Sequence, residues 1–352
     1  MAEVGPVLTT RELNRALLAR QLLLERSSLS LTAVLEQVGG LQTQYAPSGY
    51  IGLWSRMRDF ERPMLTRALE ERQAVQATLM RVTIHTVSAA DYWPMTEAIR
   101  RSRQEWWARA SRRQVEDSDI EAAARAVREM LADGPLRANE ITKGLTDRGF
   151  PSGVASGVGL WVDIVRIPPS GTWGRRRADL YGLADTWLPR KEVSEEEGIG
   201  LLVRRYLGAF GPAPVRDLAS WAGLAVNTVR PVIDRLRLRR FHDEQGVELL
   251  DNRAGPLPSP HAPAPVRFLP TWDATLLVHA RRTQILPEQY RSRVFNTKTP
   301  HSVPTFIVDG QVAGAWRLEA GRVELMPFGK LAASDRRELE DEAERLGAFH
   351  AG

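Results

Sequence analysis

Three stretches of this sequence repeat one order of elements: two helices joined by a tight turn, then two short strands around a charged hairpin. The third stretch is the clearest. Residues 213–223 (APVRDLASWAG) predict a short helix that ends at Gly223, because apolar residues recur on one helical face. Residues 241–251 (FHDEQGVELLD) predict two strands around a Gln-Gly turn. Helix, turn, helix and hairpin in this order form the winged-helix pattern.

The second helix of this third stretch is basic. We expect it to begin after Thr228, with Pro231 in its first turn, where a missing N–H costs nothing. Apolar side chains would then face the core, while Arg230 would face outwards with other charged residues. We therefore predict that Arg230 contacts DNA.

The second stretch follows the same order more loosely. Helices are expected at about 118–132 and 138–147, followed by a hairpin over 173–184. The tip of that hairpin carries Arg175, Arg176 and Arg177. Consecutive arginines on a turn usually form a solvated loop, but a wing that follows a helix-turn-helix meets the phosphate backbone. We predict that these three residues contact DNA.

The first stretch opens with a capping box from Thr9 to Glu12 and a helix to about Arg20. Further helices are expected at about 32–38 and through GYIGLWSRM, and strands are expected over RQAVQAT and MRVTIHTVS. A basic helix (101–113) then links the first stretch to the second. Its Trp106 and Trp107 are expected to pack between units more readily than to stack on bases.

A Pro-rich linker follows Asp251, and the remaining chain alternates short strands before a final charged helix. The predicted fold is mainly α with α+β modules: three tandem winged-helix units in a curved array and a small C-terminal β-rich domain. The predicted boundaries are 1–95 for the first unit, 96–190 for the linking helix and second unit, 191–252 for the third unit, and 264–352 for the C-terminal domain.

Composition narrows the possible functions. The net charge is +5, and residues 1–115 hold 16 basic and 11 acidic side chains against 32 of each in the remainder. Only four of the 48 basic residues are lysine. An arginine bias suits phosphate contacts, although the codon usage of a GC-rich genome explains it equally well. With no cysteine, no paired-His motif, no apolar span and no signal peptide, we expect a cytoplasmic protein without a metal or other cofactor.

Within the basic first unit, the stretch LQTQYAPS (41–48) carries two glutamines spaced i, i+2. In an extended segment Gln42 and Gln44 would face one groove, while Thr43 points into the core. Tyr45 is expected in the core more readily than as a stacking platform. Pro47 disfavours helix at Ala46 and would keep the segment extended. A solvated turn is the simplest interpretation of such a stretch.

Four longer segments resemble one known family. GLQTQYAPSGYIGLWSR, RVTIHTVSAADYWPM, FLPTWDATLLVHARR and FIVDGQVAGAWR occur in the order and rough spacing of the AlkZ-type DNA glycosylases, tandem winged-helix proteins. This resemblance covers nearly the whole chain. It implies a curved basic channel for duplex DNA and removal of bulky N7-alkylated purines, in some members with unhooking of interstrand crosslinks. Several members protect producers of DNA-alkylating antibiotics from their own product.

The resemblance also implies the catalytic residues. The family signature is Gln, a mostly aliphatic residue, then Gln, and Gln42-Thr43-Gln44 stands at the matching place, with Thr43 as a departure. We expect Gln44 to position a water and Gln42 to contact water or sugar. Asp273 matches a recurrent acidic position without a derivable role.

Two neutral amides suit this chemistry. Glycosidic cleavage passes through an oxocarbenium-like state, and a purine alkylated at N7 is already cationic, so it leaves without further protonation. Positioning a water and softening the growing charge then remain for the protein. Because the first unit contains no lysine, we expect a monofunctional glycosylase that leaves an abasic site.

Further DNA contacts are predicted at Arg56, Arg81, His85 and Lys298. For His85 a hydrogen-bonded structural role is the commoner alternative. For the loop around Lys298, a solvated loop and a DNA contact are equally favoured. The alternative function is a winged-helix regulator or lesion-binding protein without catalysis, since fold does not determine function. A regulator would more often carry a dimerisation helix, and the sequence shows no heptad. We expect a monomer that binds double-stranded DNA carrying bulky alkyl lesions.

Overall fold

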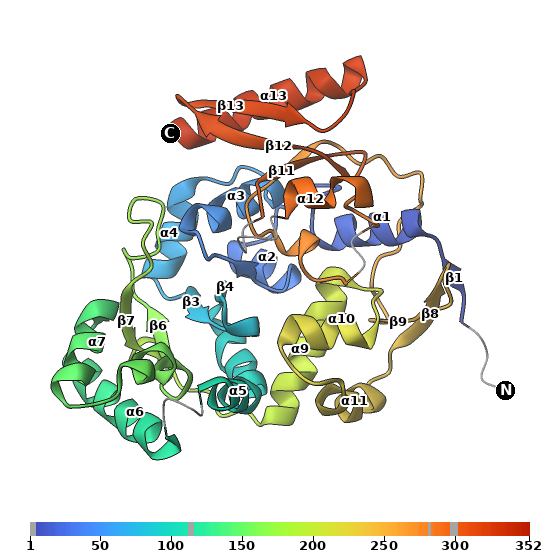
Figure 1. Cartoon of the computed structure of the whole chain (residues 1–352). Helices are drawn as coiled ribbons and strands as arrows, with labels where there is room; N and C mark the ends of the chain where they lie inside the picture. The colour runs from blue at the N-terminus through green and yellow to red at the C-terminus, as the bar shows by residue number, and fades with distance from the viewer. Residues whose placement is uncertain (1–4, 112–115, 281–282, 296–301) are drawn as a thin grey trace.

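The computed structural model describes residues 5–111, 116–280, 283–295 and 302–352. Within these residues, helices surround three small sheets, so the fold is mixed α/β (Figure 1). None of the described helices is long and apolar enough to cross a membrane. The described residues also contain no cluster of His, Asp and Glu that could hold a metal ion.

The N-terminal region forms the elements that surround the glutamine motif. The capping box of Thr9 and Glu12 is confirmed, and helix α4 is an addition to the predicted elements. The elements are β1 (Val7–Leu8), α1 (Thr10–Arg20), α2 (Leu31–Gln37), β2 (Leu41–Gln42), α3 (Ala46–Arg56), α4 (Arg62–Glu70), β3 (Ala74–Thr78) and β4 (Ile84–Ser88).

The second region begins with a helix longer than predicted. Helix α5 (Ala89–Ser111) follows β4 directly and continues through Pro94. The helices predicted at 118–132 and 138–147 are confirmed as α6 and α7. The remaining elements are α6 (Asp117–Ala132), β5 (Leu136–Arg137), α7 (Ala138–Asp147), β6 (Ile164–Arg166), β7 (Leu180–Leu183) and α8 (Ala184–Trp187).

One six-stranded sheet joins the first two regions. Its order is β2-β4-β3-β6-β7-β5, and each adjacent pair is antiparallel. Strand β3 of the first region pairs with β6 of the second, Gln76 lying opposite Arg166 and Ala77 opposite Val165. The strands of the two regions therefore share one hydrogen-bonded sheet.

The third region contains the clearest helix-turn-helix. It consists of α9 (Glu195–Phe210), α10 (Val215–Ala222), α11 (Val226–Arg235), β8 (Arg239–Asp243) and β9 (Glu248–Asp251). Gly223 ends α10 in the left-handed conformation (φ 73°), as glycine permits. The predicted start of α11 is wrong, because the helix begins at Val226 after Ala225, which places Pro231 inside it. Strand β1 adds to this wing by pairing in parallel with β8.

The C-terminal region forms a four-stranded antiparallel sheet, as its alternating strands predict. Its elements are β10 (Arg267–Leu269), α12 (Arg291–Val294), β11 (Thr305–Val308), β12 (Gln311–Glu319), β13 (Arg322–Pro327) and α13 (Ala333–Ala351). Ile51 of α3 packs into the core formed by this sheet and α13, together with Phe268 and Trp316. The C-terminal sheet thereby covers the helix that follows the glutamine motif (Figure 1).

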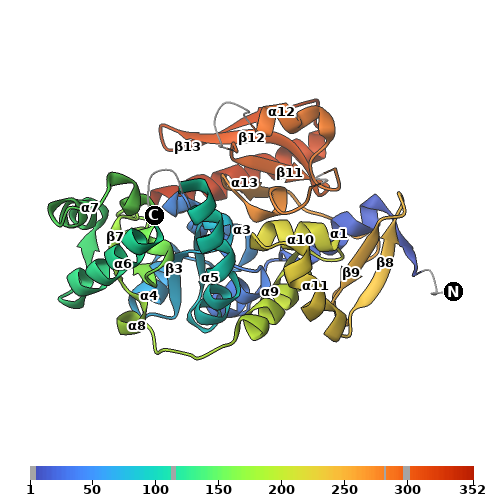
Figure 2. The same ribbon diagram turned by 60° about the horizontal axis from the view of Figure 1, so that its bottom comes forward.

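A shared core holds these regions together. One buried cluster contains Leu17 of α1, Trp93 of α5, Tyr206 of α9 and Ile307 of β11. Helices α5 and α9 lie side by side at its centre (Figure 2). This cluster therefore joins parts of all four predicted units, and smaller apolar clusters lie within or between individual regions.

Candidate active site

The glutamine motif forms an extended edge segment on the six-stranded sheet. Leu41 and Gln42 pair with Thr86 and His85 of β4, and the amide of Thr43 donates to the carbonyl of Ile84 at 2.8 Å. The chain bends at Gln44 and Tyr45, and helix α3 begins at Ala46. The prediction that Pro47 keeps Ala46 out of the helix is therefore wrong, since Pro47 occupies the first turn, where its missing N–H is tolerated.

The side chains of residues 42–44 alternate between the accessible side and the core, as predicted. Thr43 is buried, and its hydroxyl is hydrogen-bonded to that of Thr86 at 3.0 Å. A Cβ placed on Gly49 would lie 2.8 Å from Cγ2 of Thr43, so the glycine lets α3 approach the motif closely. Gln42 is half-buried and Gln44 is exposed. Thr43 therefore belongs to the packing of the motif, and the two glutamines remain on its accessible side.

The side chain of Gln44 extends the strand ladder. Its Oε1 accepts a hydrogen bond from the backbone N–H of Ile84 at 2.9 Å. This contact fixes the plane of the amide while its NH2 group and one carbonyl lone pair keep their hydrogen-bonding capacity. A preorganised acceptor of this kind can hold a water without the cost of reorientation.

Arg81 orients the other glutamine of the motif, Gln42. Its Nη2 donates to Oε1 of Gln42 at 3.1 Å, and its Nη1 donates to the carbonyl of Trp221 on α10 at 2.9 Å. Burial lowers the pKa of Arg81 from its ordinary value. The prediction of a DNA contact is not supported at this residue, because both terminal nitrogens are turned towards protein acceptors.

The backbone at Arg81 is also unusual. Arg81 and Val82 are consecutive non-glycine residues with positive φ values of 54° and 57°. Left-handed backbone at a β-branched residue costs free energy and persists where the surroundings impose it, often at functional sites. The turn after α10 supplies part of those surroundings, since a Cβ on Gly223 would lie 3.3 Å from the Arg81 nitrogen.

His85 lies behind the motif instead of facing DNA. It is buried, and its Nδ1 donates to the carbonyl of Thr83 at 3.1 Å. Burial, with the nearby charge of Arg81, lowers the pKa of His85 to about 3. A neutral, buried imidazole does not contact phosphate, so the predicted DNA contact at His85 is wrong and its structural alternative is favoured.

Arg56 is also an interior residue. Its side chain is fully buried and pairs with Oδ1 of Asp273 at 2.9 Å, with further bonds to Gly52 and Gln21. The prediction that Arg56 contacts DNA is therefore wrong. The acidic residue that sequence reasoning could not explain receives a role here, because Asp273 ties α3 to the C-terminal domain and also accepts from Thr275.

Tyr45 lies at the surface, contrary to the core position expected for it. The side chain is 41% exposed, and its hydroxyl accepts a hydrogen bond from Nη1 of Arg176 at 3.0 Å. The guanidinium of Arg176 also lies 6.0 Å from the Tyr45 ring. The arginine-rich loop of the second region thus reaches the residue directly after Gln44.

Of the other residues predicted to contact DNA, four arginines are exposed and one lysine lies outside the described residues. Arg175, Arg176 and Arg177 are exposed in the loop that precedes β7, and Arg230 is exposed on α11. These four remain predictions with an accessible position. Lys298 lies outside the described residues.

Trp106 and Trp107 of α5 have different environments in the structure. Trp107 packs edge to face on Trp161 with ring centroids 5.4 Å apart, as expected for packing between units. Trp106 is 52% exposed, so the same expectation is wrong for it. Together with Arg81 and Val82, Trp106 lines a cavity of about 440 Å³ between α5 and the turn before α11.

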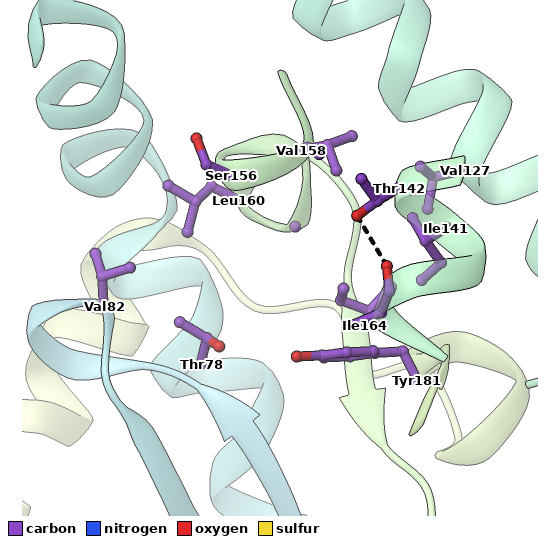
Figure 3. A pocket seen from close by; sticks show the side chains of 13 residues that line it. Thr78, Val82, Val127, Ile141, Thr142, Ser156, Val158, Leu160, Ile164 and Tyr181 are labelled. Carbon is purple, nitrogen blue, oxygen red and sulfur yellow. Dashed lines mark hydrogen bonds between the residues drawn. The ribbon is translucent and has the colours of Figure 1, made fainter. Parts of the chain in front are cut away.

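A second cavity lies at the junction of the first two regions. It has a volume of about 260 Å³, and both apolar and hydroxyl-bearing side chains line it (Figure 3). Thr78 and Val82 face Ile141 and Tyr181 across it, and neither Gln42 nor Gln44 lines it. This cavity belongs to packing between the regions and not to the glutamine motif.

Comparison with known proteins defines the class. A family model described as DNA glycosylase AlkZ-like matches residues 35–349, which include both glutamines and Asp273. The chain therefore belongs to the AlkZ-like family of DNA glycosylases. The resemblance seen in the sequence is confirmed, and DNA is the substrate class of the family.

A sequence relative and a solved structure, both from Streptomyces sahachiroi, are similar to the chain. The chain is 24% identical to an interstrand DNA cross-link repair glycosylase, with 92% of each chain covered. The solved structure of the DNA glycosylase AlkZ of that organism superposes with a TM-score of 0.81 at 18% identity, covering 98% of this chain and 97% of the other. The second likeness shows a common fold over the full length.

Proposed function

We propose that this protein is a monofunctional DNA glycosylase that hydrolyses the N-glycosidic bond of bulky N7-alkylated purines. The observation that carries the proposal is the paired anchoring of Gln42 and Gln44. Both lie on the accessible side of one extended segment, and each carbonyl oxygen accepts from a protein donor, Arg81 or Ile84. Fixed amides next to an exposed surface suit the positioning of a water.

In the proposed reaction, the oxygen of a water held by Gln44 attacks C1′ of the modified nucleotide. The bond from C1′ to the purine nitrogen breaks, and its electron pair neutralises the cationic N7-alkylpurine, which leaves without taking up a proton. The proton lost by the attacking water passes to solvent. Gln42 would hold the water or the sugar while positive charge grows on the deoxyribose ring, and the product is an abasic site.

The contacts to DNA that we propose come from the exposed arginines at 175–177 and from Arg230. Arg176 supports this assignment because it stands beside Tyr45, directly after the motif. We further propose that the helices and hairpins act as three winged-helix units along a curved duplex, with the C-terminal domain as a cap. The enzyme would work as a monomer in the cytoplasm and without a metal or other cofactor.

The biological substrate we propose is a bulky adduct of a DNA-alkylating natural product, including an interstrand crosslink. The support is the family and the relative that repairs such crosslinks. In a cell that makes the alkylating compound, this activity would serve self-resistance.

The test is base release from duplex DNA that carries one N7-methylguanine, measured under single-turnover conditions. We expect Gln44→Ala to reduce the rate on the order of a hundredfold, as loss of a preorganised polar group does. Binding to the same duplex should persist. Gln311→Ala, an exposed glutamine at the start of β12, is the matched control. Equal rates for wild type and Gln44→Ala would contradict the proposed chemistry.

A protein that only binds DNA, as a regulator or as a shield over the lesion, is the alternative. It would bind the modified duplex and release no base, whatever residue stands at position 44. The same experiment therefore separates the two functions.

A further inference from the structure

A cavity opens beside the glutamine motif and has no role in the chemistry described above. Its volume is about 340 Å³, within the usual range for small-molecule sites of roughly 300–1,000 Å³. Tyr45 and the first turn of α3 form one wall, Arg176 of the arginine-rich loop reaches it, and Trp316, Leu318 and His350 of the C-terminal domain complete it. Three parts of the chain thus meet at this cavity.

The walls present ring surfaces and apolar side chains. Trp316 is buried, and its indole N–H already donates to the carbonyl of Leu269 at 3.1 Å. Its ring therefore acts as an apolar wall, and the imidazole of His350 lies 6.1 Å from it. Leu318 is 42% exposed, so apolar surface continues towards solvent. Such walls favour a planar or ring-bearing ligand.

Polar atoms in the lining lack partners. Ser48 is 3% exposed, and its Oγ finds no hydrogen-bond partner within the described parts of the chain. The buried Nε2 of His350 also has no hydrogen-bond partner within those parts. Burial and the charges of Arg176 and Arg62 lower the pKa of His350 to about 4, so the imidazole is neutral at physiological pH. Unpaired buried polar atoms are uncommon in folded proteins and call for a ligand or another explanation.

The position of the cavity relates it to the motif. Tyr45 lines the cavity and follows Gln44 directly, so their Cα atoms are about 3.8 Å apart. Arg176 holds the Tyr45 hydroxyl and stands at the opening. In duplex DNA, N7 of guanine faces the major groove, so a substituent on N7 projects into that groove, where a protein can reach it. A protein cavity can take such a substituent while the glutamines act at the sugar.

We propose that this cavity holds the ring-bearing substituent of a bulky N7-alkylguanine and thereby determines preference for the adduct. The inference rests on the proposed function for its substrate. The ring would lie against Trp316 and Leu318, the ring and apolar walls of the cavity.

The experiment compares two duplexes of one sequence, one with a single N7-methylguanine and one with a single N7-benzylguanine. Dissociation constants and single-turnover rates of base release are measured for each. Wild type should favour the benzyl adduct. Ser48→Leu fills the cavity from its base and should reduce this preference about tenfold, the effect of losing a buried ring-sized apolar contact. Leu318→Gln removes apolar surface at the opening without changing the base and should reduce the preference about threefold.

Leu257→Gln, another partly exposed leucine but one in the linker, is the matched control and should keep the wild-type preference. Thermal unfolding establishes that each variant is folded, and Leu318→Gln decides the matter if Ser48→Leu does not fold. An unchanged preference in Leu318→Gln would overturn the proposal. An equal loss for both adducts would also overturn it, because the cavity would then serve the nucleotide and not its substituent.

The two proposals fail in different ways. If wild type releases neither base, the proposed glycosylase function fails, and the ratio of dissociation constants still tests the cavity. If both bases are released at one rate and bound with one affinity, the glycosylase stands and the cavity assignment is overturned.

Discussion

The two sides of the glutamine motif differ in what their side chains do. On the inner side, Thr43, His85 and Arg56 are buried and bonded to other protein groups. On the outer side, Gln44, Tyr45 and Arg176 are accessible, and their contacts leave polar capacity unused. The inner residues hold the segment in place, while the outer residues would meet the DNA under the proposed function. Mutations should therefore alter stability on one side and DNA chemistry on the other.

Removing a carboxylate from the inner side should have the largest effect. Asp273→Ala leaves the guanidinium of Arg56 buried without its charged partner, which costs about 3–5 kcal/mol of unfolding free energy. Urea denaturation measures this loss. Asp147→Ala is the control, because it breaks the exposed pair with Lys143 and should cost less than about 1 kcal/mol. Similar losses in the two variants would show that Arg56 is not held as an interior ion pair.

The pH dependence of stability tests the inner side at His85. Its folded-state pKa of about 3 lies below the unfolded value near 6.5, so the unfolded chain binds the proton first as pH falls. Its contribution is complete above pH 6.5 and is lost progressively towards pH 3. Between pH 6.5 and pH 5 this group should remove about 2 kcal/mol, at roughly 1.36 kcal/mol for each pH unit.

His85→Gln should flatten the fall in stability by that amount when urea unfolding is measured at both pH values. His350, whose pKa is lowered to about 4, continues to contribute in this variant. His261→Gln, in the exposed linker, is the control and should follow wild type. A slope in His85→Gln as steep as that of wild type would mean that His85 titrates normally.

The smallest effect on stability is expected on the outer side. Arg176→Gln should change the unfolding free energy by less than about 0.5 kcal/mol, because the side chain is exposed. Affinity for duplex DNA should fall, and the salt dependence of binding should lose about one phosphate contact. Binding titrations at several salt concentrations measure both. Arg253→Gln, in the linker, is the matched control, and a salt slope in Arg176→Gln equal to that of wild type would remove Arg176 from the DNA interface.

Local patterns identified much of the fold. The capping box at Thr9, the end of α10 at Gly223 and the C-terminal strands all follow from residues near them in the sequence. The pairing of β3 with β6 does not, because a strand carries no local record of its distant neighbour. The parallel pairing of β1 with β8 escaped prediction for the same reason.

Some features of the candidate site could also be predicted from local sequence, and others could not. Alternation along an extended segment placed both glutamines outside and Thr43 inside, because adjacent side chains of a strand point to opposite faces. Periodicity could not tell the buried Arg56 from the exposed Arg176. Asp273, the acidic residue in PTWDATLL, was the signal that could have indicated the burial of Arg56, since a buried arginine requires a charged partner.

The sequence by itself determined the order of most elements, the orientation of the glutamine motif and the family to which the chain belongs. Tertiary structure decided which arginines face solvent, that Tyr45 meets Arg176, and that a cavity forms next to Gln44. The physical reason is the range of the interactions. Hydrogen-bonding periodicity and capping act within one element, whereas the burial of a charge or a ring depends on groups that only folding brings together.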